Sequence, residues 1–382
     1  MASSTPLRGS TWAHERGHDP MVETSGTYAA LTGVEISWEA RTLQEFGSRS
    51  VTQLAAEYDL IVIDHPHLGD AQRDGALAAL DEQVPADALA AIMEGAVGPS
   101  AASYVMDGRV WALPIDAAAQ VAAYRPDLLP EADVPTTWQQ VAELARTGGV
   151  LWPLMPVDAV CSFLSLAAAR GTPAVQDGRF LATDDAATVL ELMRSVSAHL
   201  DPRCFDQDPI AALDVMASES SGHSYVPLAF GYSNYSRSGF APHPLRAADL
   251  PGVGSMAIAG SLLGGAGIAV SSSGAHQDEA TGYAAWVASP DVQRSQYAAA
   301  GGQPASASAW DDDEANALTD GFFRRTRTTL DHSWLRPRDV GFPAWQDAAG
   351  VLVNRCVRGN QTPEATAAAL ERTFDAEVVA LR

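Results

Sequence analysis

The architecture of this chain can be worked out from the segment Ser103-Tyr-Val-Met-Asp-Gly-Arg-Val-Trp-Ala-Leu-Pro-Ile-Asp-Ala-Ala-Ala-Gln-Val-Ala-Ala-Tyr-Arg-Pro-Asp127. Two short runs of β-forming residues, 104–106 and 110–113, flank the pair Asp107 and Gly108. An Asp-Gly pair between such runs is a strong hairpin signal, because a type I′ turn requires positive φ at both central residues. The segment therefore predicts a β-hairpin that turns at these two residues.

Prolines divide the rest of the segment. Pro114 cannot donate a hydrogen bond to a ladder, so we expect the second hairpin strand to stop there. A further extended run begins at Gln120 and ends before Pro126, because the residue preceding a proline is disfavoured in a helix. A new helix is expected from Thr137 onward. We interpret the break at Pro114 as a hinge between two lobes.

The length and charge of the chain limit what it can be. With 382 residues it is longer than one hydrophobic core usually supports, which favours two lobes. Its formal net charge of −23 repels phosphate backbones and anionic lipid headgroups, so no nucleic acid or membrane surface is expected as a partner. No run of apolar residues in the sequence approaches the roughly 18 that a membrane span requires.

The first part of the chain alternates strands and helices, which is typical of a parallel sheet covered by helices. Strands are expected at 7–12, 34–38 and 60–63, and helices at 51–58 and at 21–31, the latter ending at Gly33. In such sheets, ligands bind beyond the carboxyl ends of the strands. The loops at these ends contain the candidate ligand-binding residues Trp12, His14, Arg16, Trp38, Arg41, His65 and His67.

The second part is predicted to contain helices at 137–146, 158–170, 184–199 and 208–219, an extended segment at 224–230 and a final helix at 363–379. Aromatic side chains beside polar groups suit sugars and other ring-shaped solutes, because a ring face stacks while hydroxyl groups need partners. We therefore add Trp152, Tyr232 and Tyr235 as candidates, together with Arg237, whose guanidinium could hold a carboxylate. If Arg16, Arg41 and Arg237 face one cleft, an acidic solute is favoured over a neutral sugar.

Several of these features together resemble a known family. The hairpin ending in Ala112-Leu113-Pro114, the extended run 123–128 and the helix start 135–138 follow one another as in family 1 of the extracellular solute-binding proteins of ABC transporters, the sugar type. The glycine-rich stretch 260–270, the segment 280–290 and the loop 301–304 also resemble that family. The resemblance covers nearly the whole chain, although Arg125 stands where the family usually has an asparagine.

The resemblance implies a two-lobed, periplasmic-binding-protein-like α/β fold of type II. Such a fold has mixed sheets flanked by helices and a ligand cleft between the lobes at a hinge. The implied first lobe is 1–115 plus 260–330 and the second is 116–259, with a C-terminal helical segment, 331–382, packing across the lobes. Asp116 and Gly265 lie beside the lobe crossing and join the ligand-binding candidates, although Asp116 could equally make a hinge hydrogen bond and Gly265 could serve close backbone approach.

The function that the resemblance implies is binding without chemistry. The protein would be a monomer that closes on a small polar solute, either a carbohydrate or a sugar acid, and delivers it to ABC permease subunits. No cofactor, metal or catalytic residue is expected. The alternative is an enzyme, or an intracellular ligand-binding protein, on the same fold. Its candidate nucleophile is Cys161, expected near a helix N-terminus where a thiolate is favoured, unless that residue is an ordinary core cysteine.

The segment from His14 to His18 matches the zinc-binding pattern H-E-x-x-H, which requires a helix that places both histidines on one face. Here the segment follows a strand and contains Gly17, so no metal site is predicted. The first ten residues show neither the basic region nor the apolar core of an export signal. The resemblance implies an extracytoplasmic protein, in the periplasm or at the cell surface, whose leader was trimmed. The sequence as it stands keeps a cytoplasmic location open.

Overall fold

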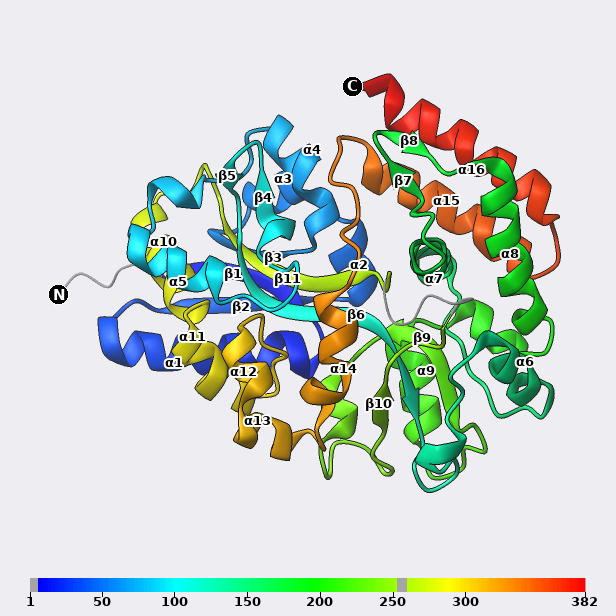
Figure 1. The fold of residues 1–382 in the computed structure, drawn as a ribbon. Helices are drawn as coiled ribbons and strands as arrows, with labels where there is room; N and C mark the ends of the chain where they lie inside the picture. Colours follow the sequence, from blue (N-terminus) through cyan, green and yellow to red (C-terminus); the bar gives the residue numbers. More distant parts are fainter. Residues whose placement is uncertain (1–5, 253–259, 382) are drawn as a thin grey trace. The chain divides into compact units, whose positions relative to one another are not determined.

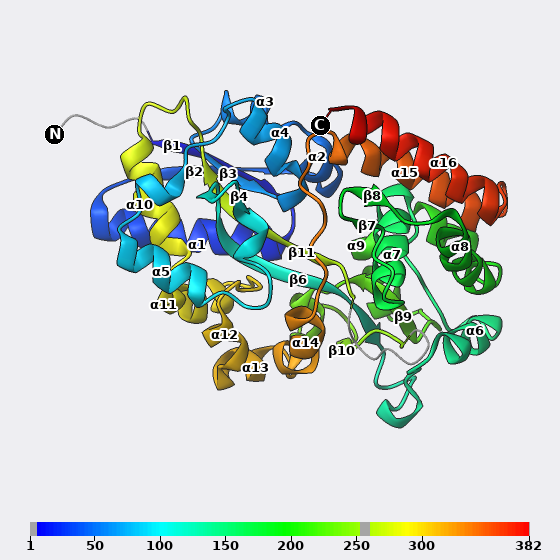
Figure 2. The same ribbon diagram turned by 45° about the horizontal axis from the view of Figure 1, so that its top comes forward.

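The structure is a computed structural model that describes residues 6–252 and 260–381. The chain divides into two compact units (Figures 1 and 2). Unit 1 consists of residues 1–118, 264–318 and 338–340, and unit 2 consists of residues 119–263, 319–337 and 341–382. The predicted lobe limit at residue 259 and the first five residues of the N-terminus lie outside the described residues. No helix in the described parts of the chain is long and apolar enough to cross a membrane.

Unit 1 is built on a mixed sheet flanked by helices, as predicted. Its sheet contains β1 (Leu7–Trp12), β2 (Ile36–Arg41), β3 (Leu60–Ile63), the first part of β6 (Leu113–Tyr124) and nearly all of β11 (Leu263–Val270). A separate hairpin contains β4 (Val105–Met106) and β5 (Arg109–Val110). The sheet order is β2-β1-β3-β11-β6. Strand β1 is parallel to β2 and β3, whereas β11 is antiparallel to β3. The helices are α1 (Glu15–Thr32), α2 (Leu43–Ser48), α3 (Val51–Ala55), α4 (Leu68–Arg73), α5 (Ala86–Glu94), α10 (Gln277–Val287), α11 (Pro290–Val292), α12 (Ala307–Asp311) and α13 (Asp313–Leu318).

Strand β3 carries the core of unit 1 on both of its faces. Its first and third residues pack in one cluster with Met21 of α1, and its second and fourth residues pack in another with Leu54 of α3. Figure 1 shows α1 on one side of this sheet and α3 with α4 on the other. All of β3 is buried, which explains the uninterrupted apolar run and confirms the strand predicted at 60–63.

Unit 2 combines a small sheet with a layer of helices. Strands β9 (Tyr225–Phe230) and β10 (Arg246–Ala248) pair antiparallel with the second part of β6, and β7 (Val175–Gln176) with β8 (Arg179–Phe180) forms a hairpin. The helices are α6 (Trp138–Arg146), α7 (Pro156–Ala169), α8 (Thr183–Ser197), α9 (Pro209–Ala217), α14 (Phe322–Asp331), α15 (Phe342–Val357) and α16 (Pro363–Glu377). The bounds of α6, α7, α8, α9 and α16 agree with the predicted helices to within two residues at each end.

The C-terminal helices α15 and α16 lie beside α7 and α8 in unit 2 (Figure 1). Phe180 joins them, because its ring centroid lies 6.5 Å from that of Phe163, 5.6 Å from that of Trp345 and 5.7 Å from that of Phe374. The division counts 341–382 with unit 2, and the expected packing of 331–382 across the two lobes stays a prediction.

The hairpin turn agrees with its prediction, but the strand that follows does not. Asp107 and Gly108 have φ values of 52° and 75°, the positive pair that a type I′ turn requires. The prediction that Pro114 ends a strand was wrong, because Pro114 lies near the start of β6, a position that proline tolerates. The chain passes from unit 1 to unit 2 after Ala118, inside β6, and not at the proline.

Helix α1 begins earlier than its predicted start at residue 21. It runs from Glu15 and contains Pro20, whose missing N–H forfeits one hydrogen bond close to the helix N-terminus. The predicted stop is confirmed: Gly33 adopts the left-handed conformation with φ 80°, and its N–H donates to the carbonyl of Ala29.

Candidate functional site

The carboxyl ends of β1, β2 and β3 meet at one edge of the unit 1 sheet. Trp12, the last residue of β1, lies directly beside Arg41, the last residue of β2, in the parallel register. The register of β1 with β3 brings the turn after Ile63 to the same edge. The structure thus places at this edge the predicted residues Trp12, His14, Arg16, Arg41, His65 and His67.

Trp12 is held in place by close packing. Its ring centroid lies 5.2 Å from that of Phe46, and the side chain is 4% exposed. A Cβ atom on Gly17 would lie 2.2 Å from the indole, so glycine is required where α1 passes over the ring. The indole Nε1 is buried and has no hydrogen-bond partner within 6–252 and 260–381. Packing therefore explains the position of the indole ring, but the indole N–H has no acceptor among the described residues.

His14 caps helix α1. Its backbone is extended, with φ −148° and ψ 149°, and its Nδ1 accepts a hydrogen bond from the N–H of Arg16 at 3.0 Å. Burial, and then the charge of Arg16, lower the pKa of His14 to about 4, so the imidazole is neutral at pH 7. Because His14 lies at the cap, it cannot form the two-histidine helical face of a zinc protease. The described residues contain no cluster of three metal-binding side chains.

Arg16 and Asp116 neutralise each other. The Nε of Arg16 donates to Oδ2 of Asp116 at 2.8 Å, and its Nη2 contacts Oδ1. Both residues are less than 5% exposed. Burial raises the pKa of Asp116, and the Arg16 guanidinium opposes that rise. Each residue therefore neutralises the charge of the other within unit 1. This pairing weakens the expectation that either residue contacts a solute directly.

Gly265 supports the same pair. It has a φ of 105°, and a Cβ atom there would lie 2.3 Å from the carbonyl oxygen of Asp116. The close approach of β11 to β6 thus requires a glycine, in agreement with the alternative that Gly265 serves backbone approach. We assign Gly265 to packing and leave it out of the proposed ligand contacts.

Arg41 lies at the same edge but lacks a carboxylate partner among the residues described. It is 5% exposed, and its Nη2 donates to the carbonyl of Val62 at 3.2 Å. Its guanidinium carbon lies 5.6 Å from the centroid of the Phe46 ring. Burial, and then the charge of Arg49, lower the pKa of Arg41 to about 10. The guanidinium therefore stays positively charged at neutral pH.

The two histidines after β3 differ in exposure. They form a short 3₁₀ turn, His65–His67, which Asp64 caps by accepting from the N–H of His65 at 2.9 Å. His65 is fully buried and its Nδ1 lies 3.1 Å from Oδ1 of Asp64, whereas His67 is half-buried. His67 is thus the histidine of this pair that a solute reaches more easily.

Trp38 is a packing residue in this structure. It lies in the middle of β2, opposite Gly9, where an added Cβ would come within 2.6 Å of the indole. Its ring centroid lies 6.1 Å from that of Tyr283 in α10. The loop prediction placed it too close to the strand end, because β2 extends three residues further than expected, to Arg41.

In unit 2, Trp152 belongs to the core. It is fully buried, its ring centroid lies 5.1 Å from that of Trp138, and its Nε1 donates to Oγ of Ser162 at 3.1 Å. The ring of Trp152 therefore packs in the core of unit 2, and its N–H is hydrogen-bonded there. We correct the prediction that it stacks on a ligand.

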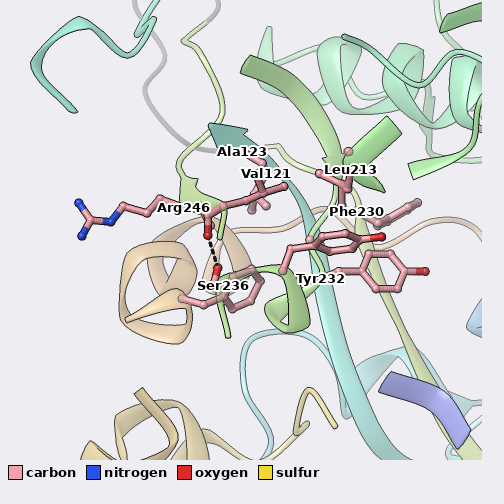
Figure 3. Close-up of a pocket in the computed structure, with 13 residues that line it drawn as sticks. Val121, Ala123, Leu213, Phe230, Tyr232, Ser236 and Arg246 are labelled. Carbon is pink, nitrogen blue, oxygen red and sulfur yellow. Dashed lines mark hydrogen bonds between the residues drawn. The ribbon is translucent and has the colours of Figure 1, made fainter. Parts of the chain in front are cut away.

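The tyrosines of unit 2 line a small hollow (Figure 3). The Tyr232 and Tyr235 rings meet edge to face, with centroids 6.5 Å apart, and the Tyr235 hydroxyl donates to Oδ1 of Asp214 at 2.6 Å. The rest of the lining is largely apolar, and the Arg246 side chain points away from the rings (Figure 3). Of the two rings, Tyr232 is the better candidate for stacking on a solute, since it is 7% exposed and Tyr235 is 2% exposed.

Arg237 directly follows the short turn Ser233–Ser236, which contains Tyr235 and is preceded by Tyr232. It is half-buried, and burial lowers the pKa of its guanidinium. The predicted residues Tyr232, Tyr235 and Arg237 therefore occupy one short segment of unit 2. Their role in binding stays a proposal.

Cys161 lies inside α7 and is 1% exposed. It packs in the main hydrophobic cluster of unit 2, which also contains Phe163 and Leu164. This burial fits the core cysteine that the sequence also allowed, because a reactive thiol needs access to its substrate. The structure gives the nucleophile hypothesis no support.

The sequence did not single out Phe46, which contacts the site, or Asp158, which is buried in unit 2. Phe46 lies between Trp12 and Arg41, on a helix whose Thr42–Glu45 capping box was the available signal. Asp158, in the first turn of α7, is buried, and its Oδ2 has no hydrogen-bond partner in the described part of the chain. Burial, and then nearby Asp208, raise the pKa of Asp158 well above its usual range. Nothing in the local sequence separates it from an ordinary solvated helix start.

Comparison with solved structures identifies the fold. An ABC transporter solute-binding protein from Agrobacterium radiobacter K84, in complex with ribitol, superposes with a TM-score of 0.84 at 18% identity, over 98% of this chain and 99% of that chain. Maltose-bound MalE3 of T. maritima gives a TM-score of 0.84 at 17% identity, over 98% and 100%. An ABC transporter solute-binding protein from Thermotoga lettingae TMO, bound to α-D-tagatose, gives 0.78 at 16%, over 98% and 99%. The predicted two-lobed α/β fold class is therefore confirmed.

The sequence itself defines the family. It matches bacterial extracellular solute-binding proteins over residues 26–321, and the chain belongs to that family. None of the curated protein sequences compared with the chain matches it.

Proposed function

We propose that this protein is the solute-binding component of an ABC importer and that its solute is a small carbohydrate or polyol. The family match over residues 26–321 is the observation that carries this proposal. The similar structures contain ribitol, maltose and tagatose, which are all polyhydroxylated and uncharged. The fold, aligned over nearly all of this chain, supports the same class of solute.

The edge of the unit 1 sheet supplies polar groups that can bind the oxygen atoms of a carbohydrate. Arg41 and Trp12 offer N–H donors, and half-buried His67 can donate or accept. In unit 2, Tyr232 offers an aromatic ring and Arg237 a guanidinium. Aromatic rings beside polar groups match the apolar faces and polar rims of sugars.

As in the family, the protein acts outside the cytoplasm, binds as a monomer and passes its solute unchanged to permease subunits. The two units close on the solute by a hinge movement, which small-angle X-ray scattering with and without solute tests. Binding alone is proposed, without catalysis.

The proposal is tested by thermal-shift screening and calorimetry with ribitol, mannitol, maltose and tagatose. A solute that binds only the folded protein adds about 2.7 kcal/mol of stability at a hundredfold excess over Kd. We expect at least one solute to raise the Tm and to be recovered unchanged. Tyr232→Ala should weaken its binding, whereas the control Tyr28→Ala, which removes a ring packed on Trp286, should not. Binding of none of these solutes and of no acidic sugar, or a sugar that is consumed, would contradict the proposal.

A further inference from the structure

We infer that the solute carries an anionic group, a carboxylate or a phosphate, and that Arg41 and the indole N–H of Trp12 hold it. This inference rests on the proposed function and specifies which carbohydrates the protein binds, namely those with an acidic group, such as sugar acids or sugar phosphates. It follows from unused hydrogen-bond donors at the carboxyl edge of the unit 1 sheet.

The guanidinium of Arg41 is buried with most of its donors unused. Its Nη2 donates to the carbonyl of Val62, but Nε and Nη1 are buried and have no hydrogen-bond partner in the described residues. Nε carries one N–H and Nη1 carries two, so three of the five donors lack acceptors. Buried donors are normally satisfied, because an unmade hydrogen bond forfeits the hydration that burial removed.

Two of the other buried arginines, Arg16 and Arg125, show what Arg41 lacks. Arg16 forms a bidentate pair with Asp116. Arg125, 3% exposed, holds both carboxylate oxygens of Asp127 at 2.8 and 2.6 Å. Arg41 is buried to a similar degree, yet its described partner is one carbonyl oxygen. A carboxylate that contacts Arg41 as Asp116 contacts Arg16, or as Asp127 contacts Arg125, would accept hydrogen bonds from its unused donors.

Nearby carboxylates do not fill this role. Glu45 is engaged by Thr42, whose N–H and hydroxyl donate to it at 3.0 and 2.9 Å. Glu39 lies 3.8 Å from Arg8 at an exposed position. Both raise the pKa of Arg41 through space, but neither forms an ion pair with it among the described contacts. The positive charge at the sheet edge is therefore left for another group.

Trp12 adds a donor at the same place. It is the register partner of Arg41, and both side chains contact the Phe46 ring. Its Nε1 is a donor only and is unused, as noted above. A set that consists of donors, one of them cationic, suits an oxyanion better than a hydroxyl group, which must also donate.

The test compares acidic solutes with their neutral counterparts on the full chain by calorimetry. The probes are D-galacturonate with D-galactose, D-gluconate with D-glucitol, and D-glucose 6-phosphate with D-glucose. The variants are Arg41→Gln, Arg41→Lys and the control Arg203→Gln, which makes the same charge change at an exposed arginine paired with Asp201. The wild-type comparison requires no variant and so does not depend on how well Arg41→Gln folds.

We expect an acidic probe to bind at least tenfold more tightly than its neutral counterpart. Arg41→Gln should remove that preference, Arg41→Lys should keep part of it, and Arg203→Gln should leave it unchanged. A preference for the uronate or aldonate identifies a carboxylate, and a preference for the phosphate ester identifies a phosphate. Neutral sugars that bind as tightly as the acids, with no effect of Arg41→Gln, would overturn this inference and leave the proposed function standing. If no probe binds, the proposed function fails as well.

Discussion

Arg16 in the first turn of α1 and Asp116 in β6 form a buried ion pair between residues that lie 100 positions apart. The guanidinium meets the carboxylate through two nitrogens, with Nε 2.8 Å from Oδ2. The pair fastens the start of α1, and with it the cap at His14, to the strand that leads out of unit 1. Arg16 and Asp116, which were predicted as separate ligand contacts, therefore bind each other. Among the predicted residues of this sheet edge, Arg41 is the cation without a carboxylate partner in the described part of the chain.

Breaking this pair should destabilise the protein strongly. Asp116→Asn leaves the Arg16 charge buried without a counter-ion, and such losses cost about 3–5 kcal/mol of unfolding free energy. Urea denaturation followed by circular dichroism measures the change. The control Asp201→Asn removes one partner of an exposed pair with Arg203 and should cost less than about 1 kcal/mol. Equal effects of the two substitutions would show that the buried pair contributes little.

Gly265→Ala should be more damaging than a comparable change at another glycine with positive φ. The added Cβ would lie 2.3 Å from the Asp116 carbonyl, which forces β11 and β6 apart. Gly33→Ala is the matched control, because Gly33 has a φ of 80° but open space around its Cβ position. We expect the control to cost about 1 kcal/mol and Gly265→Ala at least about 2 kcal/mol more. Similar melting temperatures for both variants would contradict the close approach.

His14 should make stability depend on pH. Its pKa is lowered from 6.5 to about 4 on folding, so the unfolded chain binds more protons between these values. The free energy of unfolding should therefore fall as the pH drops through this window, by on the order of 1–2 kcal/mol at pH 5. His14→Asn keeps a capping acceptor but cannot titrate, and its denaturation midpoints should show a weaker decline. A decline as steep in His14→Asn as in the wild type would contradict this prediction.

The cysteine thiols should be unreactive in the native protein. Cys161, Cys204 and Cys356 are all at most 1% exposed, and burial raises the pKa of the last two. A colorimetric disulfide reagent should detect almost no thiol in buffer and all three in denaturant. Rapid reaction of one native thiol, abolished by Cys161→Ala, would instead support the enzyme alternative.

Local patterns in the sequence were sufficient for much of the secondary structure. The strands 7–12 and 60–63, the stop at Gly33 and the turn at Asp107 and Gly108 agree with the structure, because each depends on neighbours only a few residues away. Pro114 and Pro20, which lie inside a strand and a helix, show the limit of such local rules. Their local penalties were offset by a strand and a helix that longer-range pairing holds in place.

The roles of the candidate site residues depended on contacts that no local pattern contains. The sequence placed Trp12, Arg16, Arg41 and Asp116 near one another through the rule for strand ends and through the family resemblance. The tertiary structure pairs Arg16 with Asp116, buries Trp152 in the core and leaves Arg41 beside Phe46 with unused donors. The reason is physical: propensity and periodicity act over a few residues, whereas the neutralisation of a buried charge depends on which distant side chain folding brings within hydrogen-bond distance.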